Sequence, residues 1–228
     1  ANGEECGGTL VQSFAESCNS VFAPLGAKLG PEKLFAQAVA YGFNRDPGIP
    51  GAAISTIPQP AQLGDDLQVG SSAIGQGEVQ ATPLQMGWVA SAVANRGRLP
   101  RLTLDYATGQ QKTPTTLVSS RKVALEVQRM MVAVVENGTG TAAQIPGVKV
   151  AGKTGTAELR DSQSCDDPGA DQDTCGPNPA NTDAWFTSYA PVSKPKVAVA
   201  VMLIGAGAGG DTAAPVAHDV LATALSKG

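Results

Sequence analysis

The sequence predicts an α/β protein of the α+β type, with an antiparallel sheet flanked by helices, and three observations lead to this fold class. The first part of the chain carries helical apolar patterns with capping residues at their starts. From about Val148 the pattern changes to apolar runs of strand length, separated by turn residues. A last periodic segment, about Ala214 to Leu225, predicts a closing helix. Helices followed by strands and a terminal helix indicate one sheet between helical layers.

Capping residues mark the helices expected at the start of the chain. Thr9 is suited to cap a helix that begins at Leu10, because its hydroxyl can accept a hydrogen bond from the first turn. Gly30-Pro31 opens a second helix that closes near Gly42, since proline is favoured at the first helical position. Residues 47–70 hold Pro, Gly, Ser and Thr without periodicity and are expected to form a long ordered connection.

Two more helices are expected before the strands. Thr82-Pro83 supplies the cap and the first position of a helix over Leu84 to Asn95, whose apolar residues leave no polar face. This helix is therefore predicted to be central and buried. The next helix begins at Ser119 or Ser120 and stops at Asn137-Gly138.

Three strands are expected next: Val148 to Leu159, Ala184 to Ala190 and Lys196 to Ile204. An acidic loop rich in Gly and Pro joins the first two, and a turn from Pro191 to Pro195 joins the last two. Connections without a crossover helix favour antiparallel neighbours.

Length, composition and charge allow one globular domain and exclude several classes of partner. The 228 residues, 42% hydrophobic and 16% charged, can bury one substantial core. Sixteen Lys and Arg against twenty Asp and Glu give a formal charge of −4, which provides no broad basic field for nucleic acid. The longest apolar run, Val197 to Ile204, is far shorter than the roughly 20 residues that cross a bilayer. No signal peptide is recognisable, so any targeting segment is expected outside this chain.

The cysteines and the acidic loop do not predict a metal site. Cys6, Cys18, Cys165 and Cys175 lack the paired C-x-x-C spacing of zinc ligands. Cys165 and Cys175 bracket a loop rich in Asp, Gly and Pro, and whether they form a local disulfide stays open, because pairing is not fixed by sequence. The aspartates of this loop lack the glycine and closing glutamate of an EF-hand and are interpreted as solvated. No metal and no cofactor are expected.

Lys153-Thr154-Gly155-Thr156 lies in the first expected strand and combines a cation, two hydroxyls and a residue without Cβ. Lys153 and the threonine hydroxyls can bind a carboxylate by charge-assisted hydrogen bonds, while Gly155 lets a substrate backbone approach the strand. The combination suits an acyl substrate that carries a carboxylate. Taken alone, such a segment is more often a strand with a glycine bulge.

Ser17-Cys18-Asn19 is unusual within a helix, because Ser and Asn favour caps and turns. A break in the helix is therefore expected there. In a turn, the Ser17 hydroxyl and the Asn19 amide can converge on one pocket, the first to relay a proton and the second to hold a substrate carbonyl. A capped helix junction is the alternative, and the more frequent one for an isolated tripeptide.

In this order, the two motifs resemble those of the serine transpeptidases that bind penicillin, whose set is S-x-x-K, S-x-N and K-T-G. The resemblance extends to Gly75-Gln76-Gly77, to Thr82 to Met86, to residues 135–142 and to Ala151 to Glu158, and so covers nearly the whole chain. The 152–158 segment looks like the monofunctional, class B branch. The resemblance implies the serine β-lactamase and penicillin-binding transpeptidase-like fold, incomplete at the N-terminus. Residues 1–228 would be the C-terminal part of that domain.

The resemblance implies a role for each site residue. Ser17 would be the proton-relay hydroxyl, Asn19 the contact to the substrate's peptide amide, and Lys153 an electrostatic anchor hydrogen-bonded near Ser17. Thr154 and Thr156 would hold the carboxylate of the substrate or antibiotic. The backbone N–H of Thr156 would form half of an oxyanion hole, and the nucleophile's own N–H the other half.

The nucleophile is the departure from the family pattern. In the family the S-x-x-K serine precedes S-x-N, but residues 1–16 contain no such motif. The S-x-x-K at residues 119–122 lies between the other two motifs and opens an amphipathic helix, so it is interpreted as an N-cap. Because a serine needs an adjacent base to become nucleophilic, this chain alone is not expected to acylate.

Two further patterns are interpreted as structural. Gly205-x-Gly207-x-x-Gly210 follows a strand and precedes a helix, as a dinucleotide fingerprint does, but too few residues remain for the rest of such a domain. His218 lies beside Asp219, and because neighbours in a helix point apart, the two cannot act together in a Ser-His-Asp triad.

The resemblance implies that the complete protein is a peptidoglycan D,D-transpeptidase, which cross-links stem peptides through an acyl-enzyme and is inactivated by β-lactam antibiotics. A non-catalytic β-lactam- or peptide-binding module of the same fold, a sensor or pseudo-enzyme, is the alternative. A hydrolytic relative is a third option, against which the class B form argues. An extracytoplasmic location, an N-terminal membrane anchor outside this chain and association with cell-wall synthesis proteins are also implied. Because missing strands leave sheet edges unpaired, self-association is expected.

Overall fold

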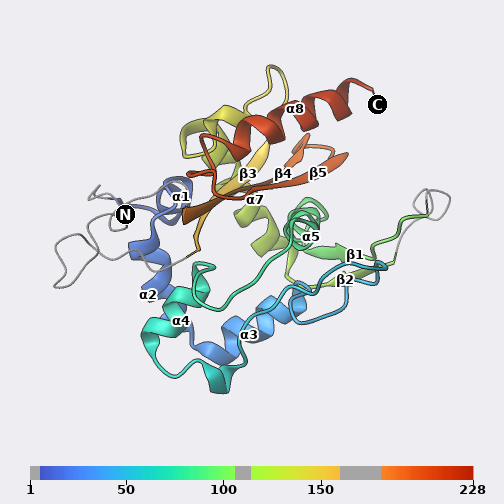
Figure 1. Cartoon of the computed structure of the whole chain (residues 1–228). Coiled ribbons are helices and arrows are strands. Elements are labelled where there is room, and N and C mark those ends of the chain that lie inside the picture. The colour runs from blue at the N-terminus through green and yellow to red at the C-terminus, as the bar shows by residue number, and fades with distance from the viewer. Residues whose placement is uncertain (1–5, 106–113, 160–180, 228) are drawn as a thin grey trace.

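A three-stranded antiparallel sheet in the order β3-β4-β5 forms the centre of the molecule. The structure, a computed structural model, describes residues 6–105, 114–159 and 181–227 (Figure 1). The strands are β3 (Ala151–Glu158), β4 (Thr182–Ala190) and β5 (Val197–Leu203). Both pairs are antiparallel, so the arrangement predicted from the sequence is confirmed.

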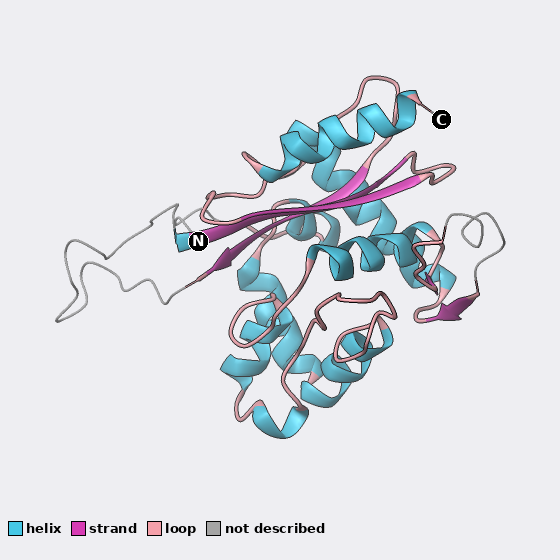
Figure 2. Ribbon diagram, turned by 45° about the vertical axis from the view of Figure 1, so that its right-hand side comes forward, coloured by secondary structure: helices cyan, strands magenta, loops and turns pink. Residues whose placement is uncertain are grey.

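Helices cover both faces of this sheet (Figure 1 and Figure 2). α8 (Ala213–Ser226) packs on one face against β4 and β5, and α5 (Pro83–Ala94) packs against the same strands from the other face. α7 (Arg121–Asn137) contacts β3 and also α5. The predicted α+β class, with a sheet between helical layers, is confirmed, as is the central position of the helix that follows Thr82-Pro83.

Alternate residues of β4 supply the cores on the two faces of the sheet. Phe186 is fully buried and belongs to the same apolar cluster as Leu221 of α8. Tyr189 is fully buried in the other cluster, with Val93 of α5 and Met131 of α7. Because successive side chains of a strand point to opposite faces, one strand provides a large aromatic side chain to each core.

Four further helices lie beside the sheet. α1 (Leu10–Ala15) packs on α7, and α2 (Asn19–Leu29) packs on α4 (Asp66–Ala73). α3 (Pro31–Ala40) follows α2 directly and contacts it. In Figure 1, α2, α3 and α4 form a layer on the side of the sheet opposite α8.

Three predicted helix starts are confirmed by hydrogen bonds at the N-cap. The hydroxyls of Thr9, Thr82 and Ser120 each accept a hydrogen bond from the backbone N–H three residues later, at 3.3, 3.1 and 3.2 Å. The S-x-x-K at residues 119–122 thus supplies the N-cap of α7, Ser120, as predicted. Its other hydroxyl, that of Ser119, accepts a hydrogen bond from Tyr41 Oη at 2.9 Å.

The long connection predicted over residues 47–70 is wrong in its second half. A short 3₁₀ helix, η1 (Pro60–Gln62), interrupts it, and α4 already begins at Asp66. The α4 sequence contains glycine and two serines, which have low helix propensity. A Cβ at Gly70 of α4 would lie only 3.0 Å from the Ala23 carbonyl oxygen of α2, so the two helices pack closely, and this packing stabilises α4.

Two three-residue strands were not predicted. β1 (Arg98–Pro100) follows α5 and pairs antiparallel with β2 (Thr115–Leu117), which precedes α7. Strands of this length have no periodicity that can be recognised in a sequence.

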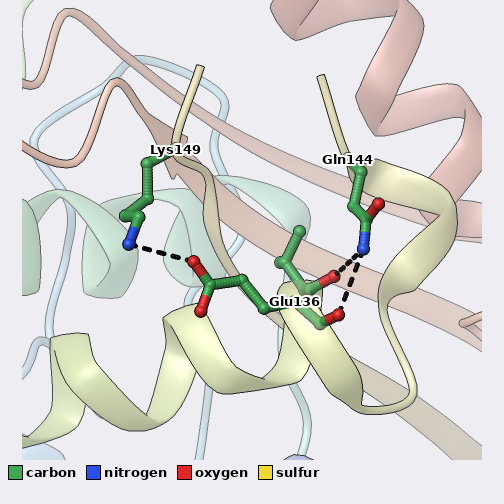
Figure 3. Close-up of polar contacts among 4 residues, drawn as sticks. Glu136, Gln144 and Lys149 are labelled. Carbon is green, nitrogen blue, oxygen red and sulfur yellow. Dashed lines mark hydrogen bonds and ion pairs between the residues drawn. The ribbon is translucent and has the colours of Figure 1, made fainter. Parts of the chain in front are cut away.

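Figure 3 shows how α7 ends. The side-chain amide of Gln144 donates hydrogen bonds to the carbonyls of Val135 and Glu136, at 2.9 and 3.2 Å, and Lys149 forms a 3.0 Å ion pair with Glu136. The last carbonyls of a helix have no partner within the helix, and Gln144 satisfies two of them. These contacts fix the end of α7 just before residues 138–140, which pack beside β3 and the end of α1.

Candidate active site

The helix break predicted at Ser17-Cys18-Asn19 is confirmed. α1 ends at Ala15, Ser17 has a positive φ of 59°, and α2 begins at Asn19. A non-glycine residue with positive φ is uncommon and redirects the chain within one residue. The turn therefore presents Ser17 and Asn19 at the junction of two helices.

A disulfide that the sequence did not predict holds this turn. Cys18 is buried and bonded to Cys6, and its backbone N–H donates to the Ser13 carbonyl at 2.9 Å. The segment before α1 is thus linked covalently to the residue between Ser17 and Asn19. Cys165 and Cys175 lie outside the described residues.

Lys153 of β3 reaches the same turn. Its Nζ donates hydrogen bonds to Ser17 Oγ at 2.6 Å and to the Thr154 carbonyl at 3.1 Å, and it lies 5.5 Å from the centre of the Phe14 ring. Burial lowers the pKa of Lys153 to about 8, because desolvation disfavours the ammonium form. The hydrogen bond to Ser17 anticipated from the resemblance is therefore present in this structure.

Thr154 is oriented by the segment after α7. Its Oγ1 lies 2.6 Å from Thr139 Oγ1, and the backbone N–H of Thr139 donates to the Ala15 carbonyl at 3.0 Å. Gly138 packs directly against the Ala15 backbone, where a Cβ would not fit. Residues 138–139 thus connect the end of α1 to β3 and hold the Thr154 hydroxyl.

Thr156 lies on β3, whose side away from β4 pairs with no other strand among the described residues and is called the free edge. Its carbonyl accepts a hydrogen bond from Gln76 Nε2 at 3.0 Å, and its hydroxyl accepts one from the Gly209 N–H at 3.5 Å. The N–H and C=O of one strand residue point to the same side, so the Thr156 N–H also points away from β4.

The glycine-rich turn before α8 forms another wall of the site. Gly209 packs against the backbone oxygens of Gly155 and Trp185, and Gly210 packs against the Thr139 carbonyl. At both positions a Cβ would overlap backbone atoms. Close packing of backbone against backbone thus gives a structural reason for glycine at these two positions.

A cavity of about 770 Å³ opens between the turn, the free edge of β3 and the glycine-rich turn. All six site residues predicted from the sequence line it, and Asn19 is exposed to solvent. They are Ser17, Asn19, Lys153, Thr154, Gly155 and Thr156.

The family model of the penicillin-binding protein transpeptidase domain matches residues 2–222. The chain belongs to this family. The peptidoglycan D,D-transpeptidase PbpA of Mycolicibacterium smegmatis is 36% identical over 237 residues, which cover 96% of this chain and 44% of that protein. The PbpA of Mycobacterium tuberculosis is 32% identical and is covered to 45%.

Solved structures of penicillin-binding transpeptidases have the same fold. The D,D-transpeptidase domain of a peptidoglycan glycosyltransferase from Eggerthella lenta aligns with a TM-score of 0.78 at 31% identity, over 96% of this chain and 53% of that one. The imipenem acyl-enzyme complex of M. tuberculosis penicillin-binding protein A aligns with a TM-score of 0.77 at 31% identity, over 98% and 48%. The chain spans about half the length of these penicillin-binding relatives.

Two contributors to this transpeptidase-family site had no role assigned from the sequence. Thr139 and Gln76 lie in segments that carry the resemblance, but their contacts to β3 span 15 and 80 residues. Residues this far apart produce no pattern that can be recognised within a short stretch of sequence. The sequence signal that could have identified them is their position in the 135–142 and 75–77 segments, which resemble the transpeptidase family.

His218 lies outside the cavity, whereas Gly210, of the glycine pattern interpreted as structural, lines it. His218 Nδ1 lies 2.8 Å from the Gln144 carbonyl, which accepts its hydrogen bond, and this contact supports the interpretation of His218 as structural. Within residues 6–105, 114–159 and 181–227, no group of three His, Cys, Asp or Glu side chains could hold a metal ion. Over the same residues, no helix is both long enough and apolar enough to span a bilayer.

Proposed function

We propose that this chain is the C-terminal part of a serine D,D-transpeptidase domain, which cross-links peptidoglycan stem peptides in the cell envelope. The observation that carries the proposal is the 2.6 Å contact between Lys153 Nζ and Ser17 Oγ at the end of a cavity bounded by the free edge of β3. In this proposal the nucleophile is the serine of an S-x-x-K motif encoded upstream of Ala1.

The acylation step follows from the chemistry of these residues. The upstream serine attacks the carbonyl of the donor peptide, and its proton passes through Ser17, held by Lys153, to the leaving amine. The Thr156 N–H donates to the oxygen on which negative charge develops, as half of an oxyanion hole. The acceptor peptide's amine then attacks the ester and releases the serine.

Substrate recognition uses the other side chains of the cavity. The hydroxyls of Thr154 and Thr156 and the Lys153 ammonium bind the donor's carboxylate by charge-assisted hydrogen bonds. Gly155 permits a close approach of the peptide to β3, and the Asn19 amide hydrogen-bonds a peptide carbonyl. A β-lactam presents the same carboxylate and acyl carbonyl and would occupy the same position.

A non-catalytic binding module of the same fold is the second candidate. In such a module, the cavity would bind peptide or β-lactam without forming an ester. Of the two candidates, the enzyme is favoured by the contact of Lys153 with a hydroxyl rather than a carboxylate, since that arrangement suits proton transfer.

Labelling by a fluorescent penicillin, read by intact mass, tests the proposal. We expect one covalent adduct on a chain extended upstream through the S-x-x-K motif, and none on the 228-residue chain. An adduct on the short chain would refute the assignment of the nucleophile to the upstream segment. No adduct on either chain, with retained reversible binding, would favour the binding module.

The location and partners of the complete protein are part of the same proposal. We expect an extracytoplasmic domain, anchored by an N-terminal membrane segment and associated with cell-wall synthesis proteins. For the 228-residue chain we expect self-association through β5, an edge strand in the described sheet whose Ala198 is exposed. Sedimentation should show concentration-dependent association that Ala198→Lys weakens; a monomer at all concentrations would contradict this.

A further inference from the structure

Gln76 makes two hydrogen bonds to the free edge of β3. Its Nε2 donates to the Thr156 carbonyl at 3.0 Å, and its Oε1 accepts from the Glu158 N–H at 3.3 Å. These backbone groups are the ones that an added strand would pair with, since residues two apart point to the same side of a strand. The Gln76 carboxamide thus makes the hydrogen bonds that a neighbouring strand would make, next to the cavity that Thr156 lines.

The backbone conformation around Gln76 orients this side chain. Gly75 and Gly77 have positive φ values of 80° and 67°, and the Gln76 N–H donates to the Ser71 carbonyl at 3.0 Å. A Cβ at Gly75 would meet no atom within 4 Å, so glycine is needed there for its backbone conformation and not for space. The turn after α4 therefore presents Gln76 to β3 in one orientation.

The helix that carries this turn is packed closely onto α2. Gly26 of α2 lies against Ala73 of α4 with no room for a Cβ, and a Cβ at Gly70 of α4 would make a tight 3.0 Å contact with the Ala23 carbonyl oxygen of α2. Asn19 is the first residue of α2. Asn19 is therefore on α2 and Gln76 is in the turn that follows its packing partner α4, and Gln76 connects this turn to the edge of β3 by hydrogen bonds.

We propose that Gln76 is a positioning residue for the acylation step: by fixing the Thr156–Glu158 edge of β3, it keeps the Thr156 N–H directed at the reacting carbonyl. This inference rests on the proposed function. A carboxamide is required because the edge offers one acceptor and one donor, which a carboxylate or a thioether cannot both satisfy. Loss of this support displaces the oxyanion donor without removing any group that binds the substrate.

The kinetic test uses the full-length protein that carries the nucleophile. Gln76→Met preserves the side-chain length and removes both hydrogen bonds, and Gln76→Glu keeps only the acceptor. Gln80→Met is the matched control, because the exposed Gln80 bonds Thr56 through its backbone alone. With a fluorescent penicillin, we expect the acylation rate constant to fall about 10- to 100-fold in both Gln76 variants, with the dissociation constant unchanged within about twofold.

Amide hydrogen exchange of β3 provides a readout independent of catalysis. We expect the Glu158 N–H to exchange at least about tenfold faster in Gln76→Met than in the wild type or Gln80→Met, because its acceptor is lost. Unchanged exchange, or an unchanged acylation rate constant, would overturn the positioning role. If the wild-type protein formed no adduct, the proposed transpeptidase function would fail, and the exchange experiment would still decide whether Gln76 fixes the edge.

Discussion

Lys153 Nζ lies 2.6 Å from Ser17 Oγ, although 136 residues separate the two in the sequence. The contact joins β3 to the turn between α1 and α2, which the Cys6–Cys18 disulfide and the positive φ of Ser17 hold in place. A partly buried ammonium group with a depressed pKa next to a hydroxyl is an arrangement suited to proton transfer.

Replacing Ser17 by alanine removes the proposed proton relay. In the full-length protein, we expect Ser17→Ala to lower the rate constant of acylation by a fluorescent penicillin about 100-fold or more, since positioned acid-base groups contribute at least that much. Ser193→Ala, in the exposed turn between β4 and β5, serves as the control. Equal acylation rates in the two variants would exclude Ser17 from the reaction.

The depressed pKa of Lys153 predicts a pH dependence of stability that can be measured on this chain. Above about pH 8 the folded protein loses the Lys153 proton, while the unfolded chain keeps it up to about 10.5. The unfolded state then binds more protons, so the free energy of unfolding rises with pH in this window. Urea unfolding should show wild type gaining stability relative to Lys153→Met between pH 8 and 10. A difference independent of pH would contradict the assigned pKa.

Thr139→Val removes the partner that orients the Thr154 hydroxyl. We expect the dissociation constant of the non-covalent β-lactam complex to rise about fivefold, which corresponds to the loss of about 1 kcal/mol from one hydrogen bond. The acylation rate constant should change less, because Thr139 contacts no proposed reacting group. Thr141→Val, an exposed position two residues later, should leave both constants unchanged. A larger effect on the rate constant than on binding would argue against this role.

Cys6→Ser opens the disulfide that links the segment before α1 to the turn. We expect the free energy of unfolding to fall by about 3 kcal/mol, the typical contribution of a disulfide that closes a loop of this length. Urea unfolding with and without reductant measures the effect. A Cys165→Ser/Cys175→Ser variant should remain sensitive to reductant, and insensitivity would show that the Cys6–Cys18 bond does not stabilise the fold.

Features set by neighbouring residues could be predicted from the sequence. Thr9, Thr82 and Ser120 cap their helices as expected, and the short turn between the strands expected at residues 184–190 and 196–204 correctly indicated antiparallel pairing. Both signals depend on contacts within a few residues. The six site residues were predicted because their types and order resemble a known family, and all six line one cavity.

The features that the sequence did not reveal depend on distant partners. α4 combines glycine and serine residues that favour other conformations, and it is helical because it packs closely on α2. Pairing of Cys6 with Cys18 is not determined by spacing alone. The roles of Thr139 and Gln76 appear only when residues 15 and 80 positions away are placed against them.

The backbone-to-backbone packing of Gly209 and Gly210 limits which residues of the proposed binding site can be substituted. A single substitution at either glycine would force the cavity wall apart, and with it the residues that the proposed reaction requires. If the chain binds β-lactams as proposed, we therefore do not expect substitutions that weaken this binding at Gly209 or Gly210. We expect such substitutions instead where side chains of α2 and of the turn after α4 line the cavity, as Phe22 and Ile74 do.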